Sequence, residues 1–225
     1  MFLFLSVLLQ AQAPSAIEKV DREKIRVAVS DSSSPLYYPV LLERWRLLDN
    51  GLSLEELRHL YYGYVFQPGY SAYADDGNQV LNQLWEQKKT EEALDTAMAV
   101  LHRSPVSLRA NFNAVIAYYA ADSTLPDFQY YMNRYKFLLS AILSSGDGNS
   151  CESAFKTIKV SDEYEIVYRH FGLPQVKSQA LVYPCDKLSV TPNDKYTAST
   201  IFFDTSESFG NYTPREGRKK KRRGR

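Results

Sequence analysis

Residues 91–105 read EEALDTAMAVLHRSP, and this stretch gives the clearest indication of fold class. Its apolar side chains recur every three or four residues, which places them on one face of a helix. They are Ala93, Leu94, Ala97, Val100 and Leu101. Several are small, so a second helix can pack closely against this face. The stretch ends at Pro105, which cannot continue the same helix. It therefore predicts an amphipathic helix inside a helical body.

Similar patterns flank this helix on both sides. They predict helices near 77–88 and 125–144, and a further helix that Ser104 caps and Pro105 opens. The second helices of the two resulting hairpins start near Thr90 and Thr124, an offset of 34 residues. This offset is the period of tetratricopeptide repeats. Stacked helical hairpins are therefore expected in this part of the chain.

Further helices are expected upstream, because about three hairpins are needed for a stable stack. The pattern predicts them at 21–30, 36–48 and 54–66. Ser53 and Glu56 form a capping box at the start of the last one. This helix is apolar or aromatic on most sides, so we expect it to be central and buried on both faces.

The pattern changes at Ser144. Short alternating runs predict strands at 154–160, 179–183, 187–191 and 197–204, with a helix at 161–171. The expected fold is mainly α, with tetratricopeptide-like helical hairpins at 17–145. A small α+β unit at 146–210 is expected to pack on them.

The first residues resemble an export signal. An apolar run at 2–9 is followed by an Ala-x-Ala pattern ending at Ala13. The run is too short to span a bilayer. We expect a signal peptide at 1–16 and a periplasmic or extracellular mature chain without a transmembrane segment; a buried N-terminal strand is the alternative.

Charge is distributed unevenly along the chain. Residues 215–225 carry eight basic side chains and one acidic side chain, which leaves 19 basic and 25 acidic side chains in residues 1–214. The acidic body argues against specific nucleic-acid binding. We expect 211–225 to be a disordered basic tail, either merely solvated or making weak, salt-sensitive contacts with polyanions.

The chain has two cysteines, Cys151 and Cys185. In an oxidising compartment they can form a disulfide that closes a loop of about 35 residues. Two separate buried thiols are the alternative.

Three runs of sequence carry a family resemblance. They are YYPVLLERW at 37–45, LSLEELRHLYYGYVFQPGY at 52–70, and GDGNSCESAF at 146–155 followed by SDEYE at 161–165. They resemble a family of exported bacterial proteins, domain of unknown function 4919, over residues 21–210. The resemblance implies a tetratricopeptide-like helical body with a small β-containing end. It implies no catalytic residue.

The densest polar and aromatic group lies at 58–70. Arg58, His59, Tyr62 and Tyr70 are its candidate ligand- or partner-binding residues, because aromatic side chains supply contact area and polar groups orient a ligand. Glu55 lies four residues before His59, so its carboxylate can pair with the imidazole. The alternative is a buried helix whose polar groups are satisfied by neighbouring residues.

Familiar catalytic and cofactor motifs are absent: there is no Gly-x-Ser-x-Gly, P-loop, dinucleotide fingerprint, His-Glu-x-x-His or Cys-x-x-Cys. We expect no cofactor and no metal. The leading hypothesis is an exported, non-catalytic interaction module that binds a protein or peptide partner. The alternatives are a hydrolase or glycan-processing enzyme using His59, and polyanion binding through the tail.

Overall fold

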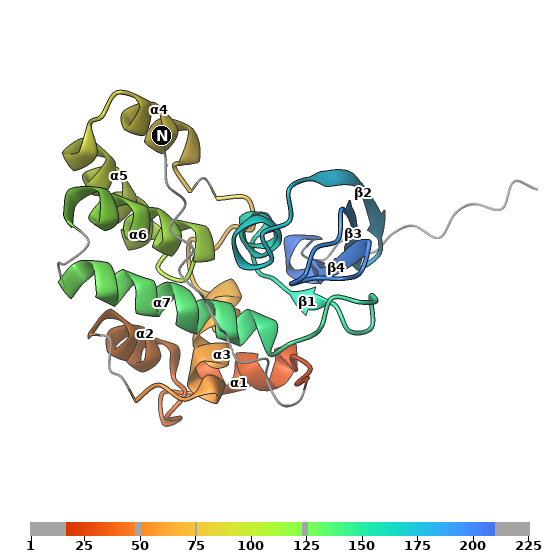
Figure 1. Cartoon of the computed structure of the whole chain (residues 1–225). Coiled ribbons are helices and arrows are strands. Elements are labelled where there is room, and N and C mark those ends of the chain that lie inside the picture. The colour runs from red at the N-terminus through yellow and green to blue at the C-terminus, as the bar shows by residue number, and fades with distance from the viewer. Residues whose placement is uncertain (1–16, 48–50, 75, 123–125, 210–225) are drawn as a thin grey trace, which may run out of the picture.

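The structure is a computed structural model that describes residues 17–47, 51–74, 76–122 and 126–209. Figure 1 shows a mainly helical body beside a small sheet. The helices of the body are α1 (Arg22–Ser30), α2 (Tyr38–Leu47), α3 (Leu54–Gly63), α4 (Asn78–Glu86), α5 (Thr90–Arg103), α6 (Leu108–Asp122) and α7 (Pro126–Leu143). The expected signal peptide and basic tail lie outside the described residues.

The central position predicted for the 54–66 helix is confirmed. Helix α3 begins with the predicted capping box, in which the Ser53 hydroxyl accepts from the Glu56 N–H and the Glu56 carboxylate accepts from the Ser53 N–H. Every residue from Leu57 to Gly63 is buried. The helix contacts α1, α2 and α7.

The remaining helices pack in chain order. Helix α4 contacts α5, α5 contacts α6, and α6 contacts α7, as Figure 1 shows. Ala93 and Ala97, which were predicted to face a neighbouring helix, are fully buried on α5. The small-residue face therefore acts as the close-packing surface that the sequence indicated.

The predicted start of α6 needs correction. The helix begins at Leu108, and Ser107 caps it by accepting from the Ala110 N–H at 3.2 Å. Pro105 lies in the preceding turn, where its carbonyl accepts from Trp45 at 3.1 Å and from Arg134 at 3.0 Å. These long-range bonds hold residues 104–107 outside the helix.

The small C-terminal unit contains four strands and one short helix. They are β1 (Phe155–Lys156), α8 (Val160–Glu165), β2 (Val176–Val182), β3 (Cys185–Val190) and β4 (Thr200–Asp204). The predicted 154–160 strand is much shorter, because the chain enters α8 at Val160. A π-helical turn, η2 (Ile166–His170), continues α8.

The sheet has the strand order β1-β4-β3-β2. Strand β1 runs parallel to β4, with Phe155 opposite Phe203. The other two pairings are antiparallel, with Leu188 on β3 opposite both Gln179 on β2 and Ile201 on β4. Strand β1 lies nearest α7, and β2 forms the opposite edge (Figure 1).

One hydrophobic core joins the body and the sheet. It extends from Ile25 on α1 through Tyr61 on α3 and Leu139 on α7 to Phe203 on β4. A smaller cluster of Leu81, Ala93 and Ala97 fills the α4–α5 hairpin. Among the described residues, no helix combines the length and apolar character that crossing a membrane requires.

Candidate functional site

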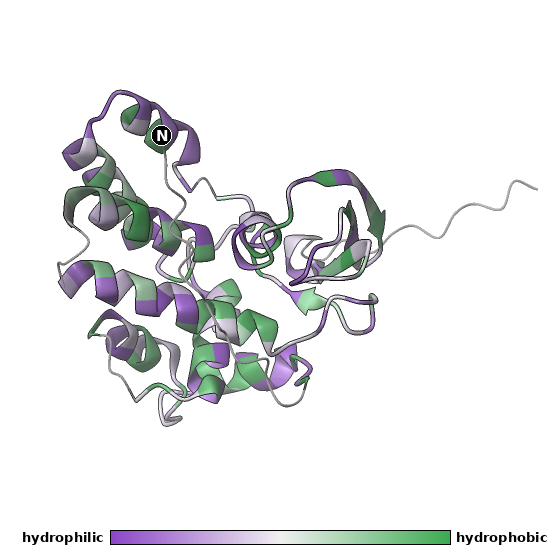
Figure 2. Cartoon of the chain, in the orientation of Figure 1, coloured by the Kyte–Doolittle hydropathy of each residue, from purple (hydrophilic) through white to green (hydrophobic). Residues whose placement is uncertain are grey.

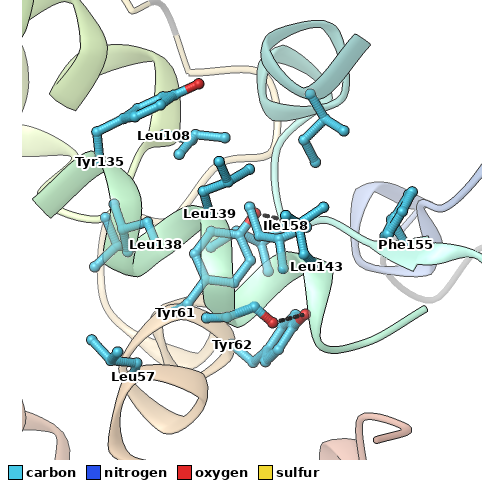
Figure 3. Packing of buried hydrophobic residues seen from close by; sticks show 14 of the residues in the cluster. Leu57, Tyr61, Tyr62, Leu108, Tyr135, Leu138, Leu139, Leu143, Phe155 and Ile158 are labelled. Atoms are coloured by element: carbon cyan, nitrogen blue, oxygen red, sulfur yellow. Dashed lines mark hydrogen bonds between the residues drawn. The ribbon is translucent and has the colours of Figure 1, made fainter. Parts of the chain in front are cut away.

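The four residues proposed from sequence lie mostly in the interior. Arg58 and His59 are each 4% exposed and Tyr62 is 3% exposed, whereas Tyr70 is partly buried. Figure 3 shows Tyr61 and Tyr62 among Leu57, Leu139 and Ile158 in the core. The helix therefore does not present these side chains as a binding surface.

Arg58 holds the start of the described chain against the end of α7. Its guanidinium donates to the Ser144 hydroxyl at 2.5 Å and to the main-chain carbonyls of Glu18 at 2.8 Å and Lys19 at 3.3 Å. The charge also lies 5.7 Å from the centre of the Tyr62 ring. These contacts explain how a charged side chain is accommodated in the core.

His59 and the two tyrosines also bond to main-chain groups. The Nδ1 atom of His59 lies 2.8 Å from the carbonyl of Glu55, so it donates there and does not meet the Glu55 carboxylate. The Tyr62 hydroxyl lies 3.2 Å from the Lys156 carbonyl, and the Tyr70 hydroxyl donates to the Ile158 carbonyl at 2.6 Å. Burial raises the pKa of both tyrosines.

A buried polar network beside these residues was not predicted. The Tyr61 hydroxyl donates to the Asp162 carboxylate at 2.8 Å and accepts from the Ile158 N–H at 3.2 Å. Asp162 also accepts from the Leu108 N–H at 3.0 Å. Burial, together with the charge of Asp76, raises the pKa of Asp162 to about 7. The sequence predicted a helix at 161–171, and the burial of Asp162 in it depends on contacts distant in sequence.

The outer edge of the sheet is an exposed feature of the structure. Among the described strands, β2 pairs only with β3. Every residue from Lys177 to Val182 is exposed. A strand in this position carries main-chain N–H and C=O groups that another extended chain can bond.

The end of this strand is apolar. Leu181 is 52% exposed and Val182 is 45% exposed. Figure 2 shows this end of β2 in the hydrophobic colour, after a hydrophilic segment. Isolated surface leucines are common, but here two exposed apolar residues follow one another on an edge strand.

Aromatic side chains flank the strand on its α8 side. The Tyr164 hydroxyl donates to Gln179 on β2 at 3.0 Å, and Gln179 donates to Asp186 on β3 at 2.8 Å. The ring of Tyr168, which is 41% exposed, stacks on Tyr164 with centroids 6.0 Å apart. We call β2 together with Tyr164 and Tyr168 the edge surface.

A disulfide anchors the edge surface at its apolar end. Cys151, in the loop after α7, bonds to Cys185 at the start of β3, with an S–S distance of 1.99 Å. Cys185 lies opposite Val182 in the β2–β3 ladder. The hairpin is therefore tied covalently to the loop before β1.

The sequence predicted the strand but not its position. The 179–183 pattern indicated a strand, whereas strand order depends on long-range pairing. Polar residues at 177–179 were the only local sign of exposure. Within the ranges that the structure describes, no three His, Cys, Asp or Glu side chains gather as ligands for a metal ion.

Comparison with known proteins places the chain in a family. No curated protein and no solved structure matches it. The family model described as Domain of unknown function (DUF4919) matches residues 23–213, which include all the strands and almost the whole helical body. The chain is therefore a member of the domain of unknown function 4919 family.

Proposed function

We propose that this protein is a non-catalytic interaction module that binds an extended segment of a partner protein along β2. The observation that carries the proposal is the run of exposed residues from Lys177 to Val182 on an edge strand. In strand addition, main-chain hydrogen bonds supply affinity, and side chains beside the strand supply specificity.

The uneven protection of the edge supports this proposal. Natural proteins block free edges with lysines and β-bulges. Strand β2 has both at its start, namely Lys177 and a register shift between Val176 and Ser178. Its end carries exposed Leu181 and Val182 instead. The open end is therefore where an incoming segment gains most from pairing.

The side chains of β2 specify the chemistry of the partner. Leu181 lies outside the bulge, whereas Lys177 lies within it and has no partner in the β2–β3 ladder. An incoming segment is stabilised by an apolar side chain opposite Leu181 and by a carboxylate near Lys177, toward the other end of the strand. We therefore assign the partner segment an apolar residue toward one end and an acidic residue toward the other.

The proposal also includes a location outside the cytoplasm and a tetratricopeptide-like helical body. The apolar run at 2–9 and the Cys151–Cys185 bond support a protein that acts outside the cytoplasm, because disulfides persist in oxidising compartments. The chain-order contacts of α4 to α7 support a tetratricopeptide-like scaffold that carries the sheet.

The test is selection of displayed random peptides on the full-length chain, with peptides of seven residues, the length of β2. Selected peptides should contain an apolar residue toward one end and an acidic residue toward the other. They should bind the Leu181→Lys variant at least about tenfold more weakly, because a charged edge opposes pairing. Binding should protect the amides of β2 from hydrogen exchange.

The variant is chosen to preserve the fold. Leu181 lies opposite Asp186, so the new lysine faces a carboxylate across the ladder. Leu47→Lys is the matched control, because Leu47 is 75% exposed on α2, far from the sheet. Peptides that bind both variants as tightly as the natural chain, or that leave β2 unprotected, would rule out this site. A dimer that Leu181→Lys dissolves would identify a second copy as the occupant.

A further inference from the structure

A cavity of about 440 Å³ lies on another part of the C-terminal unit. The end of α7, the 146–149 loop, the end of η2 and the 195–198 loop surround it. None of the residues that line it belongs to β2. The volume falls within the usual range for small-molecule sites, about 300–1,000 Å³.

One wall of the cavity is aromatic. The centre of the Phe171 ring lies 4.8 Å from that of Tyr196 and 6.0 Å from that of Phe155. Leu143 adds an aliphatic side chain. The Tyr196 hydroxyl bonds to main-chain carbonyls, including that of Gly148 at 3.0 Å, so the ring is fixed in place.

Two side chains that can donate hydrogen bonds, His170 and Lys195, line the cavity beside this wall. The His170 ring lies 4.6 Å from the Phe171 ring, and Lys195 lies close enough for its charge to affect His170. Burial, with a smaller effect of Lys195, lowers the pKa of His170 to about 4, so the ring is neutral at neutral pH. Its Nδ1 atom is sealed from solvent and has no hydrogen-bond partner among the described residues. An unpaired N–H there would be costly, so we place the proton on Nε2, the nitrogen left to meet a ligand.

A carboxylate, that of Asp147, also lines the cavity and lies near Tyr196. Burial acts to raise the pKa of Asp147, but hydrogen bonds from Ser153 at 2.6 Å and from the Asn149 N–H at 2.9 Å outweigh it, and the pKa falls. Asp147 is therefore ionised at neutral pH. Both of these bonds go to one oxygen, Oδ1.

The glycines on each side of Asp147 fix its loop. A Cβ at Gly146 would lie 2.3 Å from the Ala154 carbonyl oxygen. Gly148 has a φ of +73°, and a Cβ there would lie 2.7 Å from the Phe155 ring. Only glycine lets the backbone approach so closely, and this approach holds Asp147 beside the aromatic wall.

We propose that this cavity binds a free amino acid with a large apolar side chain. Its carboxylate would accept from His170 and Lys195, its ammonium would donate to Asp147, and its side chain would cover Phe171. A ligand with only one charge leaves either Asp147 or the pair of His170 and Lys195 without a partner. The interior of a peptide lacks both charges, which favours the free amino acid.

The test is calorimetric titration of the full-length protein with L-phenylalanine, 3-phenylpropionate and phenethylamine. These probes share the ring but carry both charges, only the carboxylate, or only the ammonium. L-Phenylalanine should bind at least about tenfold more tightly than either of the others, because charge-assisted bonds form with both of its charged groups.

Two variants test the roles of Lys195 and Asp147. Lys195→Ala should weaken the binding of L-phenylalanine and 3-phenylpropionate at least about tenfold and leave the affinity for phenethylamine unchanged. Asp147→Asn, which keeps the Oδ1 acceptor for Ser153 and Asn149, should instead weaken the binding of L-phenylalanine and phenethylamine. Lys24→Ala, at an exposed position on α1, is the control and should change none of the three affinities.

Three outcomes would overturn the proposal. They are no binding of L-phenylalanine up to about 10 mM, equal binding of all three probes, and unchanged affinity in both cavity variants. The melting temperature of each variant shows whether it is folded. Because no β2 residue lines the cavity, these results are independent of the peptide selection on the edge surface.

Discussion

At the scale of single residues, the polar groups of α3 stabilise the core. Arg58, His59 and Tyr62 were candidate binding residues because of their chemistry, and each is buried and bonded to a main-chain carbonyl. A tyrosine on a buried helix supplies ring area to the core and still needs a partner for its hydroxyl. The long-range carbonyls supplied by α7 and the 156–158 segment satisfy that need.

Tyr61→Phe should destabilise the protein by about 1–3 kcal/mol. The change removes a hydroxyl that donates to Asp162 and accepts from the Ile158 N–H, so two buried groups lose a partner. Urea unfolding measures the effect. Tyr73→Phe is the control, because Tyr73 is 69% exposed, and its effect should stay within about 0.5 kcal/mol. Equal effects of the two variants would show that the network does not contribute to stability.

At the scale of elements, the β2–β3 hairpin depends on a covalent tie. It packs on β4 along one edge only, and its outer strand is exposed. The Cys151–Cys185 bond connects residues 34 apart and holds the hairpin to the loop before β1. A binding edge of this kind benefits from rigidity, because less ordering entropy is lost when a partner docks.

Replacing Cys151 and Cys185 together by alanine should lower the free energy of unfolding by about 3–4 kcal/mol, as expected for a loop of this length. In this variant the amides of β2 and β3 should exchange with solvent faster than those of α3. Urea unfolding and hydrogen exchange measure the two effects. A reductant should destabilise the natural chain and leave the double variant unchanged. A loss below about 1 kcal/mol would show that packing alone holds the hairpin.

At the scale of the whole molecule, buried carboxyl groups gather where the sheet meets the helical body. Asp162 and Glu163 on α8 are both fully buried. Neither carboxylate oxygen of Glu163 has a hydrogen-bond partner among the described residues. Burial, with the nearby charges of Asp186 and Asp162, raises the pKa of Glu163 well above its usual range.

These groups give a defined dependence of stability on pH. Between the unfolded and folded pKa values, the folded protein holds protons that the unfolded chain has lost, so stability falls as pH rises. Glu163→Gln removes one such group. The stability of this variant should therefore fall less steeply than that of the natural chain between about pH 5 and pH 8, where one proton contributes at most about 1.4 kcal/mol per pH unit.

Urea unfolding midpoints between about pH 5 and pH 8 measure the difference in pH dependence between the variant and the natural chain. His170 acts in the opposite direction, because its lowered pKa makes the folded state lose stability as pH falls below the ordinary histidine value. It is present in both proteins, so its effect cancels in the comparison. Parallel pH profiles would show that Glu163 is ionised in the folded state at neutral pH.

Most of the secondary structure could be predicted from local patterns. Helical periodicity located α1 to α5 and α7 within a few residues, and the Ser53–Glu56 capping box identified the start of α3. The start of α6 was misplaced, because Pro105 is held in a turn by Trp45 and Arg134. Such bonds join distant segments, and local patterns do not reveal them.

For the candidate sites, too, some properties follow from local sequence patterns and others only from long-range packing. Composition and periodicity were sufficient to predict a helical body, a small β-containing end and a buried α3, because these properties follow from the spacing of apolar side chains. Strand order placed β2 at the edge, and long-range packing brought Asp147, His170 and Lys195 around one cavity while burying Arg58 and Tyr62. The type of a residue determines which contacts its side chain can make. Only the tertiary structure determines whether other parts of the protein already satisfy those contacts.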